Sequence, residues 1–242
     1  MISILNKEIQ AFLSSLTGYI VIAVFLISVG IFMWIFSDTS VLDYRFATLD
    51  QLFSIGPLVF LFLIPAITMR SFAEEKNKGT IEFLFTKPLT VTDIILGKYL
   101  ANVTLVAMSL IPTLVYYYSV YQLGSPKGNL DTGAIIGSYI GLFFLGACFV
   151  ALGMFASALT HNQIVAFIAG AFLCFFFHWA FTYLSRLPAF ASSYDLFIQK
   201  LGINFHYSSI SKGVIDSRDI LYFLSLIFIF LWLTYIQLEK KK

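Results

Sequence analysis

Six long apolar runs dominate the pattern of hydrophobic and polar positions, and none of them contains Asp, Glu, Lys or Arg. A bilayer core about 30 Å thick requires roughly 20 helical residues at about 1.5 Å each. The pattern therefore predicts an all-α polytopic membrane protein with six transmembrane helices. The predicted spans are Thr17–Phe36, Leu52–Met69, Tyr99–Val120, Thr132–Leu159, Ile164–Leu184 and Ile220–Leu238.

The composition agrees with a lipid environment. Hydrophobic residues make up 59% of the 242 residues and charged residues only 12%, whereas a soluble domain is about 25% charged. The formal net charge of +2 gives no indication of a nucleic-acid partner. Cys148 and Cys174 both lie inside apolar runs, where we interpret them as buried thiols that form neither a disulfide framework nor a metal site.

Residues 1–16 precede the first span and have an amphipathic pattern. Their apolar positions share one helical face, with Lys7, Glu8 and Gln10 elsewhere, which favours a helix lying along the inner membrane interface. An ordinary polar extension is the alternative. The positions on the apolar face are Leu5, Ile9, Phe12, Leu13 and Leu16.

Six spans place both termini on the same side of the membrane, and the basic residues indicate which side. With the termini in the cytoplasm, nine Lys and Arg residues lie inside and six outside. Basic residues accumulate in cytoplasmic segments of membrane proteins. The sequence therefore predicts a multi-pass protein of the inner, cytoplasmic membrane with both termini cytoplasmic.

The segment between the second and third spans, residues 70–98, is the most highly charged part of the chain, with nine charged residues among 29. Glu74 and Lys78 are spaced at i,i+4, which favours a helix. Gly79 breaks that helix, and Thr80 is placed to begin a second, short one.

Pro88 is expected to end the short helix, because proline removes a backbone donor and clashes with the preceding turn. Thr90 and Asp93 then have the spacing of an N-terminal capping box for the helix that enters the third span. These breaks predict a compact cytoplasmic elbow on which a partner docks. A solvated interfacial loop is the alternative.

The residues of this elbow also carry a family resemblance. The stretch "MRSFAEEKNKGTIEFLFTKPLTVTDIILGKYLA" resembles the signature of the ABC-2 class of ABC-transporter permeases. "SALTHNQIVAFI" and "SKGVIDSRDILYFLSLIFIFLWLTYIQLEKKK" resemble the family's inner turn after the fourth span and its last helix. The resemblance covers essentially the whole chain and is greatest to the gliding-motility-associated permease subunit of gliding bacteria.

The resemblance implies a single transmembrane domain over residues 1–242, with residues 70–98 as the coupling helix region and residues 185–219 as outer helices that dip back toward the membrane. The family's inner-loop motif falls on Glu74, Glu75, Gly79, Thr80, Glu82 and Pro88, with Gly97 and Lys98 opening the third span. Together with Lys78, the predicted ATPase-coupling residues are Glu74, Glu75, Lys78, Gly79, Thr80, Glu82, Pro88 and Lys98.

The implied partners are cytoplasmic ABC ATPase subunits and a second permease, as a homodimer or a heterodimer, and the implied activity is ATP-driven export. A non-transporting membrane scaffold for a cell-surface machine is the alternative function. The chain itself lacks a phosphate-binding loop, because "DIILGKY" has neither the first glycine nor the hydroxyl residue that such a loop needs. We therefore expect no cofactor here, with ATP bound by the partner, and no catalytic residues.

His178 is the one titratable His, Asp, Glu, Lys or Arg within the predicted spans. We interpret it as a packed or interfacial residue hydrogen-bonded to a neighbouring helix, with a proton-relay role as the alternative. The three histidines are far apart in sequence and predict no metal site. Pro65 and Pro112 are expected to interrupt the second and third spans.

Two further features concern packing and the outer side. Gly133, Gly137 and Gly141 clear one face of the fourth span, either for packing inside the subunit or for a contact between subunits. The long segment Ser185–Asp219 is expected to form an outer lid or gate, and the alternative is a loop ordered only by outer partners.

Overall fold

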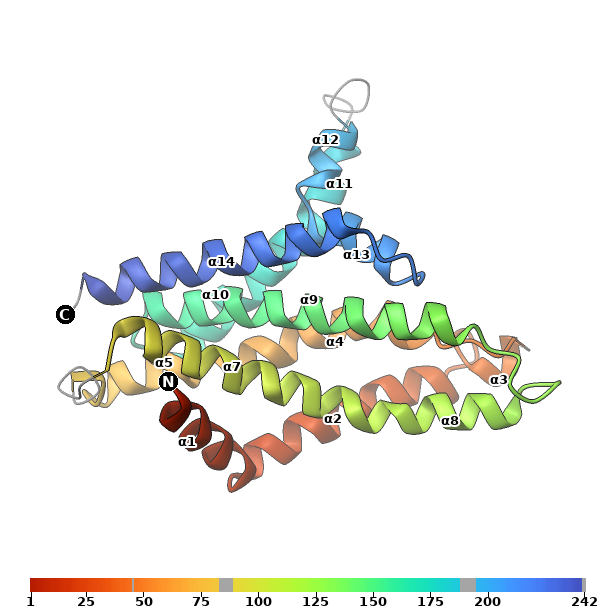
Figure 1. The fold of residues 1–242 in the computed structure, drawn as a ribbon, viewed down its shortest axis with the longest axis horizontal. Helices are drawn as coiled ribbons and strands as arrows, with labels where there is room; N and C mark the ends of the chain where they lie inside the picture. Colours follow the sequence, from red (N-terminus) through yellow and green to blue (C-terminus); the bar gives the residue numbers. More distant parts are fainter. Residues whose placement is uncertain (45, 83–88, 188–194, 241–242) are drawn as a thin grey trace.

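The computed structural model describes residues 1–44, 46–82, 89–187 and 195–240, and the regular elements in these ranges are all helical. The all-α prediction is therefore confirmed for this part of the chain (Figure 1). In chain order the elements are α1 (Ile2–Leu13), α2 (Leu16–Trp34), α3 (Val41–Tyr44), α4 (Asp50–Thr68), α5 (Arg70–Asn77), α7 (Val91–Leu110), η1 (Ile111–Thr113), α8 (Leu114–Leu123), α9 (Thr132–Leu159), α10 (Gln163–Phe175), η2 (Phe176–Ala180), α11 (Phe181–Ser185), α12 (Asp195–Lys200), α13 (Ile203–Ile210) and α14 (Ser217–Glu239).

Five helices within the described ranges are long and apolar enough to cross a bilayer. Helices α1 and α2, which meet at an angle of 66°, provide a sixth span if the pair is counted as one broken span. The sequence predicted six spans, and the structure gives five or six, which confirms a multi-pass membrane protein. The helices that qualify singly are Asp50–Asn77, Val91–Leu123, Thr132–Leu159, Gln163–Ser185 and Ser217–Glu239.

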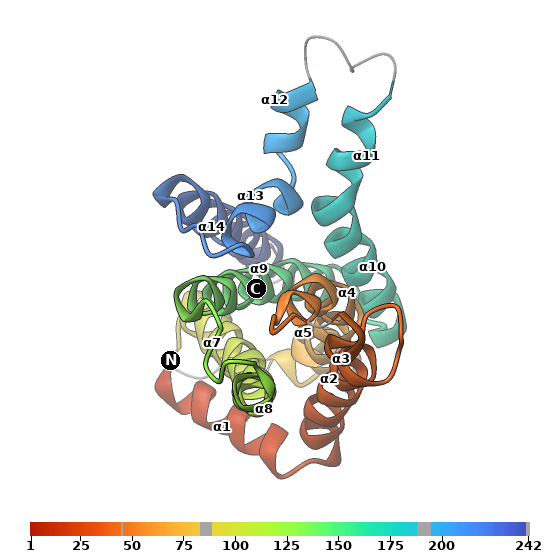
Figure 2. The same ribbon diagram turned by 90° about the vertical axis from the view of Figure 1, so that its right-hand side faces the viewer.

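Helix α9 is the centre of the bundle, with α4, α7, α10 and α14 packed around it (Figures 1 and 2). Small residues on α9 allow these neighbours to approach closely. At Gly153, an added Cβ would overlap the Thr68 hydroxyl of α4, and the Cα of Gly153 lies 3.5 Å from a Cβ built on Gly170 of α10. The three helices therefore meet at this point with almost no side chain between them.

The glycine face at the start of α9 packs within the chain. A Cβ on Gly137 would lie 2.9 Å from the Cα of Gly213, and a Cβ on Gly141 would contact Ile210 of α13. Of the two alternatives for this face, the structure supports packing inside the subunit. Gly133, at the first turn, meets only Asp131 at 3.5 Å.

The two prolines behave differently. The third span changes to a 3₁₀ turn at Pro112, as predicted, before continuing as α8. Helix α4, in contrast, continues through Pro57 and Pro65 to Thr68. The interruption expected at Pro65 is therefore wrong in position, and the break lies at Met69, between α4 and α5. Its cause is a side chain from α9, described below.

The fifth span does not follow the bundle to its end. After the π-helical turn η2, which changes the direction of a helix by adding residues to one turn, α11 points away from the bundle together with α12 (Figures 1 and 2). Helix α13 then returns, and its Ile203, Tyr207 and Ile210 are buried against the bundle. The lid role of residues 185–219 stays a prediction, and residues 188–194 are outside the described part.

His178 lies in the π-helical turn and is 2% exposed. Its ring has edge-on contacts with Phe149 and Trp179, at centroid distances of 5.8 and 4.4 Å. This confirms the packed part of the interpretation. The hydrogen bond to a neighbouring helix is not found at Nδ1, which is buried without a partner.

Candidate functional site

The elbow begins with α5, whose two faces differ in burial. Phe72 and Ala73 are completely buried and Lys76 is 7% exposed, whereas the C-terminal end of the helix is open to its surroundings. The Lys76 ammonium group donates a hydrogen bond to the carbonyl oxygen of Ala158, in the last turn of α9. A cation is favourable at this end of a helix, where backbone carbonyls lack partners. One face of α5 is therefore fixed to the central helix.

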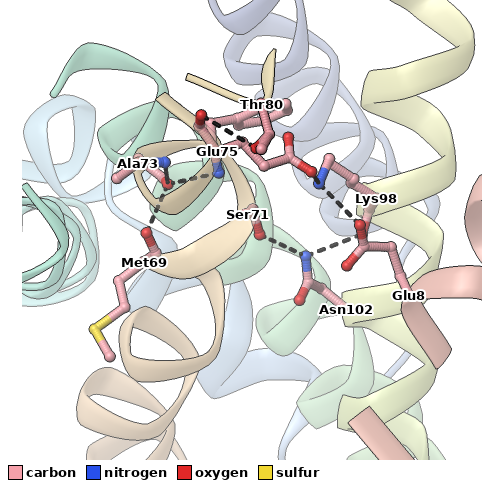
Figure 3. Close-up of polar contacts among 10 residues, drawn as sticks. Glu8, Met69, Ser71, Ala73, Glu75, Thr80, Lys98 and Asn102 are labelled. Carbon is pink, nitrogen blue, oxygen red and sulfur yellow. Dashed lines mark hydrogen bonds and ion pairs between the residues drawn. The ribbon is translucent and has the colours of Figure 1, made fainter. Parts of the chain in front are cut away.

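Lys98 of α7 joins α5 to the N-terminal helix α1 (Figure 3). Its Nζ lies 2.8 Å from Glu75 Oε1 and 2.9 Å from Glu8 Oε1. The Lys98 side chain is only 3% exposed, and its Nζ lies 5.6 Å from the centroid of the Phe72 ring. Because both carboxylates share one buried ammonium group, this cluster holds three segments that are far apart in sequence.

A second polar layer lies beneath the Lys98 cluster. The Asn102 side-chain amide donates to Ser71 Oγ at 3.1 Å and to the Lys98 carbonyl oxygen at 2.9 Å (Figure 3). Asn102 Oδ1 and Glu75 Oε2 are buried without partners. Unpaired buried oxygens cost free energy, so this layer is the less completely satisfied part of the site.

Ser157 of α9 explains the break between α4 and α5. Its hydroxyl accepts hydrogen bonds from the backbone N–H groups of Phe72 and Ala73, at 3.1 and 3.0 Å. It also donates to the Met69 carbonyl oxygen at 2.9 Å. A side chain that enters the backbone hydrogen-bond ladder kinks a helix. The direction of α5 is thus set by a residue 85 positions further along the chain.

Replacing Ser157 by alanine should destabilise the chain by about 1–3 kcal/mol, because buried N–H groups of α5 lose their acceptor. The free energy of unfolding, measured by detergent titration in mixed micelles, tests this. Ser208→Ala is the matched control, since the Ser208 hydroxyl is exposed and bonds only the Phe205 carbonyl of its own helix. Equal stability of the two variants would contradict the role given to Ser157.

Two of the predicted coupling residues, Glu75 and Lys98, lie in the buried cluster, with exposed fractions of 16% and 3%. The backbone N–H of Thr80 donates to the Glu75 carbonyl oxygen at 2.9 Å, which returns the chain over the end of α5. Glu75 and Lys98 therefore face the helix bundle rather than open space, whereas the Thr80 side chain is exposed.

The other predicted residues that the structure describes lie on the open side of the elbow. The Lys78 ammonium group and Glu74 carboxylate form an exposed ion pair at 2.6 Å, as their spacing predicts. Gly79 has a φ of +67°, a conformation that glycine adopts at little cost, and it ends α5 as expected. Glu82 is exposed. Pro88 lies outside the described residues.

The predicted capping box at the start of α7 is confirmed. The Asp93 N–H donates to Thr90 Oγ1 at 3.1 Å, and the Thr90 N–H donates to Asp93 Oδ2 at 3.3 Å. Helix α1 packs beside this segment, where a Cβ on Gly97 would lie 3.0 Å from Ile4. Sequence reasoning did not find that α1 belongs to the site, because Glu8 and Lys98 are 90 residues apart.

Fold, elbow and membrane spans agree with the outcome of the sequence comparison. A sequence model of the ABC-2 family of transporter proteins matches residues 2–242. The chain belongs to the ABC-2 transporter family. A comparison with curated protein sequences gave no match. ABC-2 permeases associate with ABC ATPase subunits and are typically the non-catalytic membrane component, so this chain is the membrane component of an ABC-2 transporter.

Within the described residues, no group of three or more His, Cys, Asp or Glu side chains lies close enough together to bind a metal ion. The charged groups of the elbow instead pair with one another. These contacts fix one face of α5 to α1, α7 and α9. The other face of α5 is left available for contact with another protein, so the arrangement can transmit force.

Proposed function

We propose that this ABC-2 protein is the permease subunit of an ATP-driven exporter and that its partner ABC ATPase docks on the open face of the elbow. The observation that carries the proposal is the division of α5 into two faces. Its inner face is bound to the bundle through Lys98, Ser157 and Lys76. Glu74, on its other side, pairs with Lys78, the residue that follows the helix. Mixed charges on a rigid element favour a specific partner and orientation.

The proposed mechanism follows from these attachments. A force applied to the outer face of α5 acts on α9 through Ser157 and Lys76, and on α7 and α1 through Lys98. Since α9 packs against α4, α10 and α14, a small movement of α5 displaces most of the spans. Closure of two ATPase subunits on a permease dimer would in this way rock the helices between inward-open and outward-open arrangements.

The elbow is proposed to be cytoplasmic, in an inner membrane, with both termini on the same side. The excess of basic residues on that side supports this orientation. In Figure 1, α5, the start of α7 and both chain termini lie toward the same end of the long axis of the bundle. The similarity to gliding-motility-associated permeases makes a surface motility machine the proposed setting.

The decisive experiment reverses charges on the open face. The double variant Lys78→Glu, Glu82→Lys is expected to weaken co-purification with the ABC ATPase by about tenfold or more, equivalent to about 1.4 kcal/mol. Permease-stimulated ATP hydrolysis should fall in parallel. The matched control reverses two exposed charges elsewhere in the chain, Asp38→Lys and Lys212→Glu, and should assemble normally.

Unchanged assembly and hydrolysis in the Lys78, Glu82 variant would contradict docking at this face. ATP-dependent accumulation of cargo in reconstituted vesicles separates the exporter from a scaffold. Normal ATPase assembly without any transported cargo in a screen of lipid and glycan substrates would favour the scaffold.

A further inference from the structure

Two grooves follow one another along α4 and α5. The first, of about 440 Å³, is polar and opens between α1, α5 and α7. Cations on its wall include Lys7 and Arg70, while Ala11 and Phe12 give it an apolar side. It lies where α4 passes into α5 and where α1 bends by 66° into α2. The apolar run Leu52–Met69 ends at this point.

The second groove is almost entirely apolar and has a volume of about 480 Å³. It is formed between α2 and α4, with Phe167 of α10 at one side. On α2 it extends from Ile20 to Phe32, and on α4 from Leu58 to Ala66. At about 1.5 Å per residue these stretches are about 18 and 12 Å long, close to the roughly 15 Å depth of one leaflet.

A single helical stripe connects the two grooves. Phe62 and Ala66 line the apolar groove, and Arg70 lines the polar one. Residues four apart share a helix face, and the step from Ala66 to Arg70 is about 6 Å along the axis. The surface therefore changes from apolar to cationic over the distance that separates the acyl chain of a phospholipid from its phosphate group.

The charges of the polar groove leave it suited to an anion. Its four cations, Lys7, Arg70, Lys78 and Lys98, outnumber its three carboxylates, Glu8, Glu74 and Glu75. Lys7 is exposed and forms no ion pair within the described part of the chain. Cationic side chains at the membrane surface attract phosphate groups of the inner leaflet.

We propose that a glycerophospholipid occupies both grooves, with an acyl chain between α2 and α4 and its phosphate beside Lys7 and Arg70. A soluble partner would not reach the apolar groove, which lies within the spans. A second copy of the chain could cover that apolar groove but gives no account of the cationic groove next to it. The bound lipid would fix α1 against the elbow, beside Glu74 and Lys78, which also line the polar groove.

The test uses the full chain in nanodiscs with two photoactivatable phospholipids, reactive either at the acyl terminus or in the headgroup. The acyl probe should label residues 20–32 and 58–66 at least about fivefold more than the lipid-facing Ile229 of α14, a difference of about 1 kcal/mol. The headgroup probe should label residues 7–15 and 70–80. Mass spectrometry of the purified chain should find a retained glycerophospholipid.

Two variants address the two grooves separately. Ala66→Trp should abolish acyl labelling of the groove, and Lys7→Glu, at an exposed position, should lower headgroup labelling about fivefold. The matched controls Ile229→Trp and Lys240→Glu should change neither. Uniform labelling of all lipid-facing helices would overturn the proposal. A retained lipid of another class would also overturn it. The same holds if two chains that carry Phe62→Cys form a disulfide while the groove stays unlabelled, because a second copy of the chain would then cover the groove.

Discussion

Replacement of Lys98 by methionine is expected to lower the free energy of unfolding by about 3–5 kcal/mol. Methionine fills a similar volume but leaves the carboxylates of Glu8 and Glu75 in a largely buried site without their shared cation. An uncompensated buried charge is much more costly than the loss of an exposed ion pair. Detergent titration of the purified chain in mixed micelles, followed by circular dichroism, measures this effect.

Two further variants separate the ion cluster from general packing. Lys78→Met removes an exposed ion pair and should cost no more than about 1 kcal/mol. The triple variant Glu8→Gln, Glu75→Gln, Lys98→Met removes every charge of the cluster and should recover most of the stability lost in Lys98→Met. If Lys98→Met proves as stable as Lys78→Met, the cluster does not hold the three helices together.

The sequence predicted the spans well because the bilayer imposes a length and a polarity on each helix. Thr132–Leu159 was predicted with the same limits that α9 has in the structure. The path of the fifth span could not be predicted, since hydropathy is the same for a helix that follows the bundle and for one that leaves it at a π-helical turn. The break at Met69 was missed for a related reason, because its cause is Ser157 rather than the nearby Pro65.

The same distinction between local and distant causes applies to the elbow. Contacts between residues three or four positions apart, such as Glu74 with Lys78 and the Thr90 capping box, follow from helix geometry and were predicted. The partners of Lys98 were not, because Glu8 lies 90 residues away on a different helix. A lysine entering an apolar span is itself a sign of a distant carboxylate, but it does not say which one.

The attachments of the elbow converge on α9, so the packing of α9 decides how far a movement of α5 is transmitted. Ser157 and Ala158 hold α5 at one end of α9. One turn away, Gly153 allows α4 and α10 to approach closely. A connection without intervening flexible side chains transmits displacement rather than absorbing it. Gly153 is therefore the position where a small change should have a large effect.

The Gly153→Val variant is expected to destabilise the chain by about 3 kcal/mol or more, because overpacking of a close helix contact forces the helices apart. A Cβ at this position would overlap Thr68 Oγ1 and lie 3.0 Å from Thr68 Cβ. Thr68 is completely buried, and its hydroxyl donates to the Ile64 carbonyl oxygen at 3.0 Å, so it has little freedom to move. The detergent titration used for Lys98 measures the loss.

A double-mutant cycle shows whether the clash with Thr68 is the cause. Thr68→Ala makes room beside Gly153, so the double variant Gly153→Val, Thr68→Ala should be more stable than Gly153→Val alone. Gly133→Val is the matched control on the same helix, since a Cβ there meets only Asp131 at 3.5 Å. Equal losses of stability at Gly133 and Gly153 would mean that valine acts through its lower helix propensity. In that case α4 and α9 would not be in close contact, and α9 would not transmit a movement of α5 in the way proposed.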